Sequence, residues 1–338
     1  MKIPVPTNLR RWAASVSILI SLCGAAQAQA FKYHSFVPAG SGETIPGSIN
    51  ERGDIAGLYL DAKSVVHGFY RSAGGSIFAI DPPGSTGTIA RGVDAAGDIS
   101  GYYQDQAGSY HGFVRESAGK YVSFDATSTA TFTIVLANNS AGLLVGLFLD
   151  PLGVNYGFLR TPNGTVTSFG VSGSTGTVAV SISDAGEIAG YYTDAKNVQH
   201  GFLRTSIGAT SSFDPPGSVL TLPAAINRAG QIVGFYIDAK QVQHGFLRDA
   251  DGTFVAIDPP GSSATDVTAI SPDGVAVGNY ESGGAQHGFL RKADGNLVSF
   301  DPPGSTDTSV FGITCSHEII GNENSHKGVF RGFVLTTH

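Results

Sequence analysis

Five histidines of this 338-residue chain each precede an aspartate by 14 positions, a pairing that could carry general acid–base chemistry. A carboxylate bonded to an imidazole orients the ring and stabilises its protonated form. A catalytic dyad, however, is needed once, near a substrate, whereas these pairs recur along the chain. We therefore predict a structural role for the pairs His67 and Asp81, His111 and Asp125, His200 and Asp214, His244 and Asp258, and His287 and Asp301.

Metal chemistry has weaker support. The best cluster is Cys315, His317 and His326, but an expected strand over residues 319–323 separates the two histidines. Five extended residues span about 16 Å, too far for one zinc ion to bind both ends with bonds of about 2 Å. The remaining alternative is a two-residue chelate by Cys315 and His317. We predict no metal site and no cofactor.

A Gly-Phe pair recurs through the chain at intervals of 43 to 45 residues and places the His and Asp pairs in a repeat. A Thr and a Gly precede each pair at fixed positions. Seven copies are present, and their phenylalanines are Phe69, Phe113, Phe158, Phe202, Phe246, Phe289 and Phe333.

Each repeat is expected to form four short β-strands. In the second copy these cover residues 88–93, 99–103, 111–115 and 121–124, which are rich in β-branched and aromatic residues and bounded by turn residues. Pro82-Pro83-Gly84 predicts a type II turn, because Pro fixes φ and Gly accepts a positive φ. Four strands in about 44 residues are typical of a β-propeller, so the sequence predicts an all-β propeller of seven blades.

The two ends of the chain are expected to close the ring. The last repeat stops after its third strand, residues 329–335, and lacks a fourth. Residues 31–36, followed by a turn, align with the fourth strand of other repeats. We predict that this strand completes blade seven, and that residues 31–338 form one domain.

The repeats also resemble a known family. His200-Gly201-Phe202-Leu203-Arg204 is similar to the repeat of the HAF family of bacterial extracellular proteins, which is named for a His-Ala-Phe triplet. The resemblance covers nearly all of residues 31–338. It implies secretion and a repeat fold, and it implies no reaction or ligand. Tyr156 and Arg331 depart from the triplet.

These two departures support direct contact between the paired residues. Where Tyr156 replaces His, Gly170 replaces Asp, and where Arg331 replaces His, the closing strand offers Val37. Loss of one partner alone would leave a buried polar group unpaired, at a cost of about 1–3 kcal/mol. We also expect the Thr that begins each innermost strand to bond its own turn.

Residues 1–30 are predicted to be a secretory signal peptide. Lys2, Arg10 and Arg11 precede a short apolar run over residues 13–24, and small residues follow at positions 26–30. We expect a Sec signal cleaved near residues 28–30 and a secreted or periplasmic protein. The apolar run is too short to span a bilayer, so no membrane insertion is expected.

Removal of residues 1–30 takes away three basic residues and leaves 17 Lys and Arg against 27 Asp and Glu, a formal charge of −10. An acidic surface repels phosphate backbones, so nucleic acid is not an expected partner. Cys315 becomes the one remaining thiol, and no disulfide can form within the chain.

A unique ligand site requires departures from the repeat. The clearest are Phe132, Asn155 and Tyr156 in the third repeat, together with Arg91, a basic residue on an expected innermost strand. No single set of acid, base and nucleophile converges elsewhere. The sequence therefore favours a non-catalytic binding or scaffold propeller that presents loops to a protein or glycan, and we expect it to be a monomer. The alternative is an enzyme, a lyase or hydrolase, acting at the channel mouth.

Overall fold

The computed structural model describes residues 31–325 and 329–337. The predicted signal peptide, residues 1–30, and His326 lie outside the described residues. The described residues form 28 β-strands and no helix. They therefore include no helix that is long and apolar enough to cross a membrane. Three sheets have four strands and two have eight. In each larger sheet a single parallel bridge, Glu43 with Phe330 or Gln243 with Ala264, joins two four-stranded antiparallel units. The strands thus divide into seven such units, which suggests seven blades.

The strands of the seven units follow one another along the chain, except that β1 joins the last unit. Units 1 and 2 contain β2 (Ser41–Ile49), β3 (Ile55–Asp61), β4 (Val66–Arg71) and β5 (Ile77–Ile80), then β6 (Gly87–Val93), β7 (Ile99–Gln104), β8 (Tyr110–Arg115) and β9 (Tyr121–Phe124). Units 3 and 4 contain β10 (Thr133–Asn138), β11 (Leu144–Leu149), β12 (Asn155–Arg160) and β13 (Val166–Phe169), then β14 (Gly176–Ile182), β15 (Ile188–Thr193), β16 (Gln199–Arg204) and β17 (Thr210–Phe213). Units 5 and 6 contain β18 (Ser218–Ile226), β19 (Ile232–Asp238), β20 (Gln243–Arg248) and β21 (Phe254–Ile257), then β22 (Ala264–Ile270), β23 (Ala276–Ser282), β24 (Ala285–Arg291) and β25 (Leu297–Phe300). Unit 7 contains β26 (Ser305–Ile313), β27 (Ile319–Ser325), β28 (Phe330–Thr337) and β1 (Phe31–Phe36).

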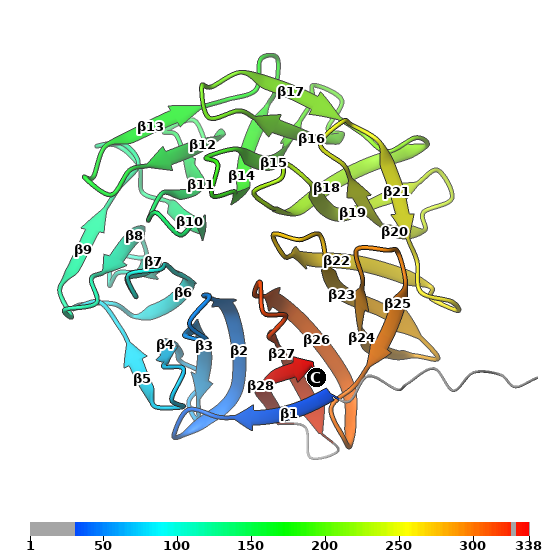
Figure 1. Ribbon diagram of the computed structural model, residues 1–338. Coiled ribbons are helices and arrows are strands. Elements are labelled where there is room, and N and C mark those ends of the chain that lie inside the picture. The colour runs from blue at the N-terminus through cyan, green and yellow to red at the C-terminus, as the bar shows by residue number, and fades with distance from the viewer. Residues whose placement is uncertain (1–30, 326–328, 338) are drawn as a thin grey trace, which may run out of the picture.

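The units lie side by side around one axis, with the first strand of each innermost (Figure 1). The first and last units meet through β1, which runs antiparallel to β28 from Phe31 opposite Thr337 to Phe36 opposite Gly332. The predicted pairing of residues 31–36 with the end of the chain is therefore confirmed. The four strands expected in the second repeat are also confirmed, with bounds that differ by at most one residue.

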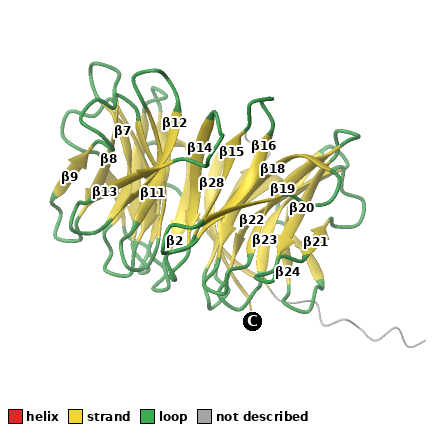
Figure 2. Ribbon diagram, turned by 90° about the horizontal axis from the view of Figure 1, so that it is seen from above, coloured by secondary structure: helices red, strands yellow, loops and turns green. Residues whose placement is uncertain are grey.

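Loops gather at the two ends of the strands (Figure 2). We call one end the histidine face, because the third strands begin there with the His residues; its loops include residues 61–65 and 82–85. The opposite end, the arginine face, carries turns such as residues 50–54 and 72–76. The predicted turn at Pro82 is present: Ser85 N–H donates to Pro82 O at 3.1 Å, and Gly84 has φ +84°.

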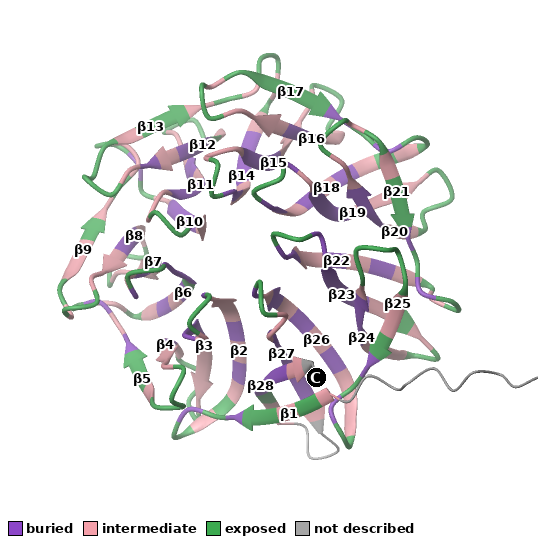
Figure 3. Ribbon diagram, in the orientation of Figure 1, coloured by how far each residue is buried: buried purple, intermediate pink, exposed green. Residues whose placement is uncertain are grey.

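The core lies between units and is built from one position of the repeat. The third-strand phenylalanine is fully buried in all seven units, and the inner strands are more buried than the outermost ones (Figure 3). Phe202 lies opposite Gly190, where an added Cβ would stand 2.1 Å from Val178 O and 2.9 Å from the Phe202 ring. Glycine is required here because backbone and ring both occupy the space that a side chain needs.

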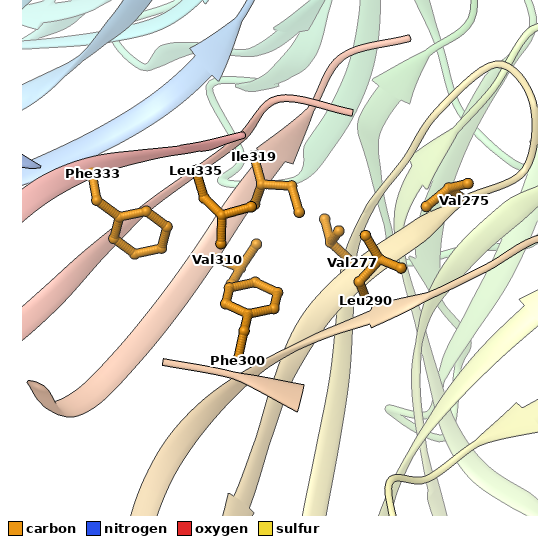
Figure 4. Packing of buried hydrophobic residues seen from close by; sticks show 8 residues of the cluster. All are labelled: Val275, Val277, Leu290, Phe300, Val310, Ile319, Phe333 and Leu335. Atoms are coloured by element: carbon orange, nitrogen blue, oxygen red, sulfur yellow. The ribbon is translucent and has the colours of Figure 1, made fainter. Parts of the chain in front are cut away.

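Aliphatic side chains of neighbouring units complete each layer of the core. Between units 6 and 7, eight buried residues point toward one another (Figure 4): Val275, Val277, Leu290, Phe300, Val310, Ile319, Phe333 and Leu335. Because each unit buries its face against the next, stability depends on the whole series of contacts.

Candidate functional site

In each of the five predicted pairs on the histidine face, the His and the Asp lie within hydrogen-bond distance of each other. Each His is the second or third residue of a third strand, and each Asp directly follows a fourth strand. The distances from Nδ1 to the carboxylate oxygen are 2.8 Å for His67 and Asp81, 2.7 Å for His111 and Asp125, 2.7 Å for His200 and Asp214, 2.9 Å for His244 and Asp258, and 2.8 Å for His287 and Asp301.

A second carboxylate, which the sequence analysis missed, faces the other ring nitrogen of four of these histidines. It comes from the loop before the third strand, six residues ahead of the His. The Nε2 to carboxylate distances are 3.8 Å for Asp61 and His67, 3.3 Å for Asp105 and His111, 3.6 Å for Asp194 and His200, and 3.6 Å for Asp238 and His244. The constant spacing of six residues was the available signal.

Aromatic rings and inner-strand hydroxyls complete the surroundings of these pairs. The Tyr192 ring lies 5.2 Å from the His200 ring at 28°, and the Thr221 hydroxyl donates to Asp214 at 2.6 Å. Thr308 donates to Asp301 in the same way. The expected contact with the local turn is present as well, since Thr221 and Thr308 each lie 3.4 Å from the Ser hydroxyl three residues before them. The hydroxyl therefore bonds both its own turn and the carboxylate of the preceding unit.

The pair is missing in unit 3, next to the inner-strand Thr177 of unit 4. Tyr156 stacks on Phe148 with centroids 5.8 Å apart, and no carboxylate follows the fourth strand because residue 170 is Gly. The Thr177 hydroxyl then accepts from Val171 N–H at 3.0 Å. The same contact occurs beside an intact pair, where Thr133 Oγ1 accepts from Ala126 N–H at 3.1 Å. The backbone contact of the Thr therefore does not depend on loss of the carboxylate.

The pair of His200 and Asp214 is expected to stabilise the fold in a pH-dependent way. Burial disfavours the charged imidazole, but hydrogen bonds to Asp214 and Asp194 and their charges outweigh burial and raise the pKa of His200. The stabilisation is therefore complete below the ordinary pKa of about 6.5 and is lost as pH rises through the raised pKa of the folded protein.

We expect His200→Gln to lower the free energy of unfolding by about 1 kcal/mol near pH 5.5, a value kept small by partial solvent exposure. The loss should shrink as the pH rises beyond the folded pKa. Urea unfolding of both proteins at an acidic and an alkaline pH measures it, with Asp214→Asn as a partner variant. Equal losses at the two pH values would contradict this expectation.

Three of the four predicted ligand residues gather at the histidine-face end of unit 3. Asn155 and Tyr156 begin β12. Phe132 lies beside the end of β11, because its backbone O accepts from the N–H of Leu149 at 3.1 Å. Leu149 is the last residue before the loop that leads to β12. Phe132 packs on Tyr110 with centroids 5.1 Å apart. Tyr156 is 36% exposed.

Leu152, which the sequence analysis missed, projects from the same end. It lies in the loop between β11 and β12 and is 87% exposed. The equivalent loop position carries Lys63, Lys196 and Lys240 in units 1, 4 and 5. We call Phe132, Leu152, Asn155 and Tyr156 the unit 3 patch.

Arg91, the fourth predicted ligand residue, lies apart from this patch. It lines a cavity of about 340 Å³ between the innermost strands, together with Leu136 and Asn138. These residues are four and six positions beyond Phe132, and a strand advances about 3.3 Å per residue. Arg91 therefore sits deeper along the axis than the end of unit 3.

Solved structures with similar folds were found at low sequence identity. A catalytically inactive virginiamycin B lyase from Staphylococcus aureus, in a structure with quinupristin, is 13% identical, with a TM-score of 0.59 over 91% of this chain and 99% of that chain. A lectin from Burkholderia pseudomallei is 12% identical, with a TM-score of 0.54 over 91% and 96% of the two chains. The β-propeller domain of the trilobed protease from Pyrococcus furiosus, described as having an open velcro topology, is 8% identical, with a TM-score of 0.54 over 87% and 94%.

The chain has a β-propeller fold. These identities show the fold alone, since propellers with different functions share it. No family model matches the chain, and no curated protein sequence matches it.

In this propeller, Cys315 and His317 bond separate carboxylates on the arginine face. The Cys315 thiol and backbone N–H donate to Glu51, while His317 Nε2 lies 3.0 Å from Asp273 Oδ2. Within residues 31–325 and 329–337, no three His, Cys, Asp or Glu side chains are grouped as a metal site. His326, the third member of the sequence cluster, is outside those residues.

Proposed function

We propose that this propeller is a non-catalytic binding protein that presents the unit 3 patch to a protein partner. The observation that carries the proposal is the exchange of charged or paired side chains for apolar ones at a single unit. Leu152 stands where three other units have Lys, and Tyr156 stands where five have a bonded His. Exposed apolar side chains gathered at one place are typical of interaction sites.

The remaining chemistry of this face favours binding over catalysis. For four of the five histidines, a carboxylate faces each of the two ring nitrogens. The ring is therefore held in place and is poorly available for proton transfer to a substrate. Within the unit 3 patch no side chain is charged, and the Asp150 carboxylate beside it accepts from Leu152 N–H and Val154 N–H at 2.9 Å each. An uncharged surface of this kind suits an apolar protein surface better than a sugar.

The proposal includes a closed ring of seven blades and export from the cytoplasm. The pairing of β1 with β28 supports closure, since it places the first strand of the described chain in the last unit. The basic and apolar pattern of residues 1–30 supports export. The His-Gly-Phe repeats support a relation to the HAF family of extracellular proteins.

A second candidate function is an enzyme, a lyase or hydrolase, acting in the central cavity. It is favoured by Arg91, which is the one charged residue among the described residues that line the cavity between the innermost strands. A guanidinium among small aliphatic and hydroxyl side chains could bind an anionic substrate group.

The test is a pull-down with the chain from residue 31, using an extract of the organism that encodes it. We expect the Leu152→Lys, Tyr156→Ala double variant to recover at least tenfold less partner protein than the unmodified chain. Ile207→Lys, which changes a residue that is 92% exposed on the arginine face, is the matched control and should recover the partner fully. Equal recovery by all three proteins would disprove the proposal, and a glycan array would detect a sugar partner.

A further inference from the structure

A polar cavity of about 180 Å³ lies at the histidine-face end of unit 6, away from the unit 3 patch. Its lining includes Gln243 from unit 5 and Asp266, Asn279, Glu281 and Gln286 from unit 6. The strand register explains why these residues meet. Gln243 lies opposite Ala264 in the strand pairing, and Ala264 lies opposite Glu281 on its other side. Glu281 in turn lies opposite Gln286. Asp266, two residues past Ala264, lies opposite Asn279.

This cavity has polar residues at two facing positions that are apolar in units 1 to 5. Unit 7 has Ser309 and Asn322 at these positions, so the carboxylate alone is particular to unit 6. In units 1 to 5 the residue after the inner-strand Thr is aliphatic, and in unit 6 it is Asp266. The residue after the second-strand Gly is aliphatic or aromatic in the same five units, and in unit 6 it is Asn279. The replaced residues are Ile45, Ile89, Ile134, Val178 and Leu222 at the first position and Leu58, Tyr102, Leu147, Tyr191 and Phe235 at the second.

One of the two N–H donors of each amide group around the cavity is already used. Gln243 Nε2 donates to Thr265 O at 3.1 Å, Gln286 Nε2 donates to Ser309 Oγ at 3.2 Å, and Asn279 Nδ2 donates to Val310 O at 3.4 Å. The amide oxygens of Gln243 and Gln286 make no hydrogen bond with the described residues. The cavity therefore offers acceptors and few donors.

The carboxylates have no positive partner either. Among the described residues, neither the Asp266 carboxylate nor the Glu281 carboxylate forms an ion pair or accepts a hydrogen bond. A third carboxylate, Asp307 of unit 7, lies 3.4 Å from Gln286 N and adds negative charge. Asp266 is partly buried and Glu281 is exposed, so the two carboxylates line the inner and outer parts of the cavity.

We infer that this cavity is a binding site for a calcium ion, held by the Asp266 and Glu281 carboxylates and the amide oxygens of Gln243 and Gln286. Calcium takes six to eight oxygen ligands from carboxylates, carboxamides and water in flexible geometry. Opposite and diagonal neighbours on adjacent strands have Cβ atoms about 5–8 Å apart, which lets their side chains reach one ion. Zinc prefers nitrogen and sulfur ligands, which the lining lacks, and a sugar would require donors as well.

Calcium titration of the metal-free chain by calorimetry tests the inference. We expect one ion per chain with a dissociation constant on the order of 10⁻⁴ M, the range of extracellular calcium modules, weaker binding of Mg²⁺, and a higher melting temperature in calcium. Asp266→Asn and Glu281→Gln should each weaken binding at least tenfold. Asp294→Asn, an exposed carboxylate on the arginine face of the same unit, is the matched control and should bind as the unmodified chain does.

Asp266→Leu guards against a folding defect, because Leu222 occupies the same position in unit 5. It should fold and lose the calcium-dependent shift in melting temperature. Absence of calcium binding by the unmodified chain at millimolar calcium would overturn the inference. Unchanged binding by Asp266→Asn and Asp266→Leu, or tighter binding of Mg²⁺ than of Ca²⁺, would also overturn it.

Discussion

A chain that begins at residue 37 is expected to lose most of the cooperative unfolding transition of a chain that begins at residue 31. The deletion removes β1 and leaves β28 as an unpaired edge. It also removes Phe36, which is buried against Phe69 with centroids 5.9 Å apart. The Phe31 ring lies 5.4 Å from Phe300.

The expected loss is large because burial of each aromatic side chain contributes about 1.5–3 kcal/mol. Together with the strand pairing, the loss is several kcal/mol, against the roughly 5–15 kcal/mol that stabilises a typical protein. Urea unfolding followed by circular dichroism measures the change. Lys32→Ala, on the exposed side of β1, is the control and should change stability by less than about 0.5 kcal/mol. An unchanged urea midpoint for the shortened chain would refute ring closure by β1.

Phe202→Ala is expected to lower the free energy of unfolding by about 3–5 kcal/mol, the usual cost of removing a fully buried phenylalanine. Phe202 has no exposed surface, and its ring covers Gly190 from the neighbouring strand. Because that strand has no side chain at Gly190, nothing on it can move in to fill the space. A cavity therefore remains.

Ile207→Ala in the same unit is the matched control for this substitution. Ile207 is 92% exposed in a turn, so its removal should change stability by less than about 0.5 kcal/mol. Thermal and urea unfolding of the two variants give the comparison. Similar losses in both would mean that the third-strand phenylalanines do not form the core of the units.

Much of the fold could be predicted because its determinants are local and repeated seven times. The strand over residues 121–124 and the closing strand over residues 31–36 have the predicted bounds. Alternation within short segments and turns such as Pro82 to Ser85 set those bounds, and neither depends on distant residues. The contact between His and Asp could be predicted because Tyr156 and Gly170 depart from the repeat together.

The candidate sites were less accessible to prediction. Arg91 and Phe132 both depart from the repeat, but sequence spacing does not show how far along the axis each lies. Leu152 was missed because a single exposed Leu in a loop is ordinary in a sequence. It becomes notable only beside the exposed Tyr156.

Local sequence patterns account for the all-β class, the seven four-stranded repeats, the residues that meet within a unit and the pairing of β1 with the last unit, since hydrophobic alternation and turn chemistry act over a few residues. Which side chains of different units face one another depends instead on how the units pack in the folded protein. Gln243 and Asp266 come from different units, and whether their oxygens meet in one cavity depends on the packing of neighbouring sheets. That packing is the sum of many contacts across the interface, so no local pattern records it.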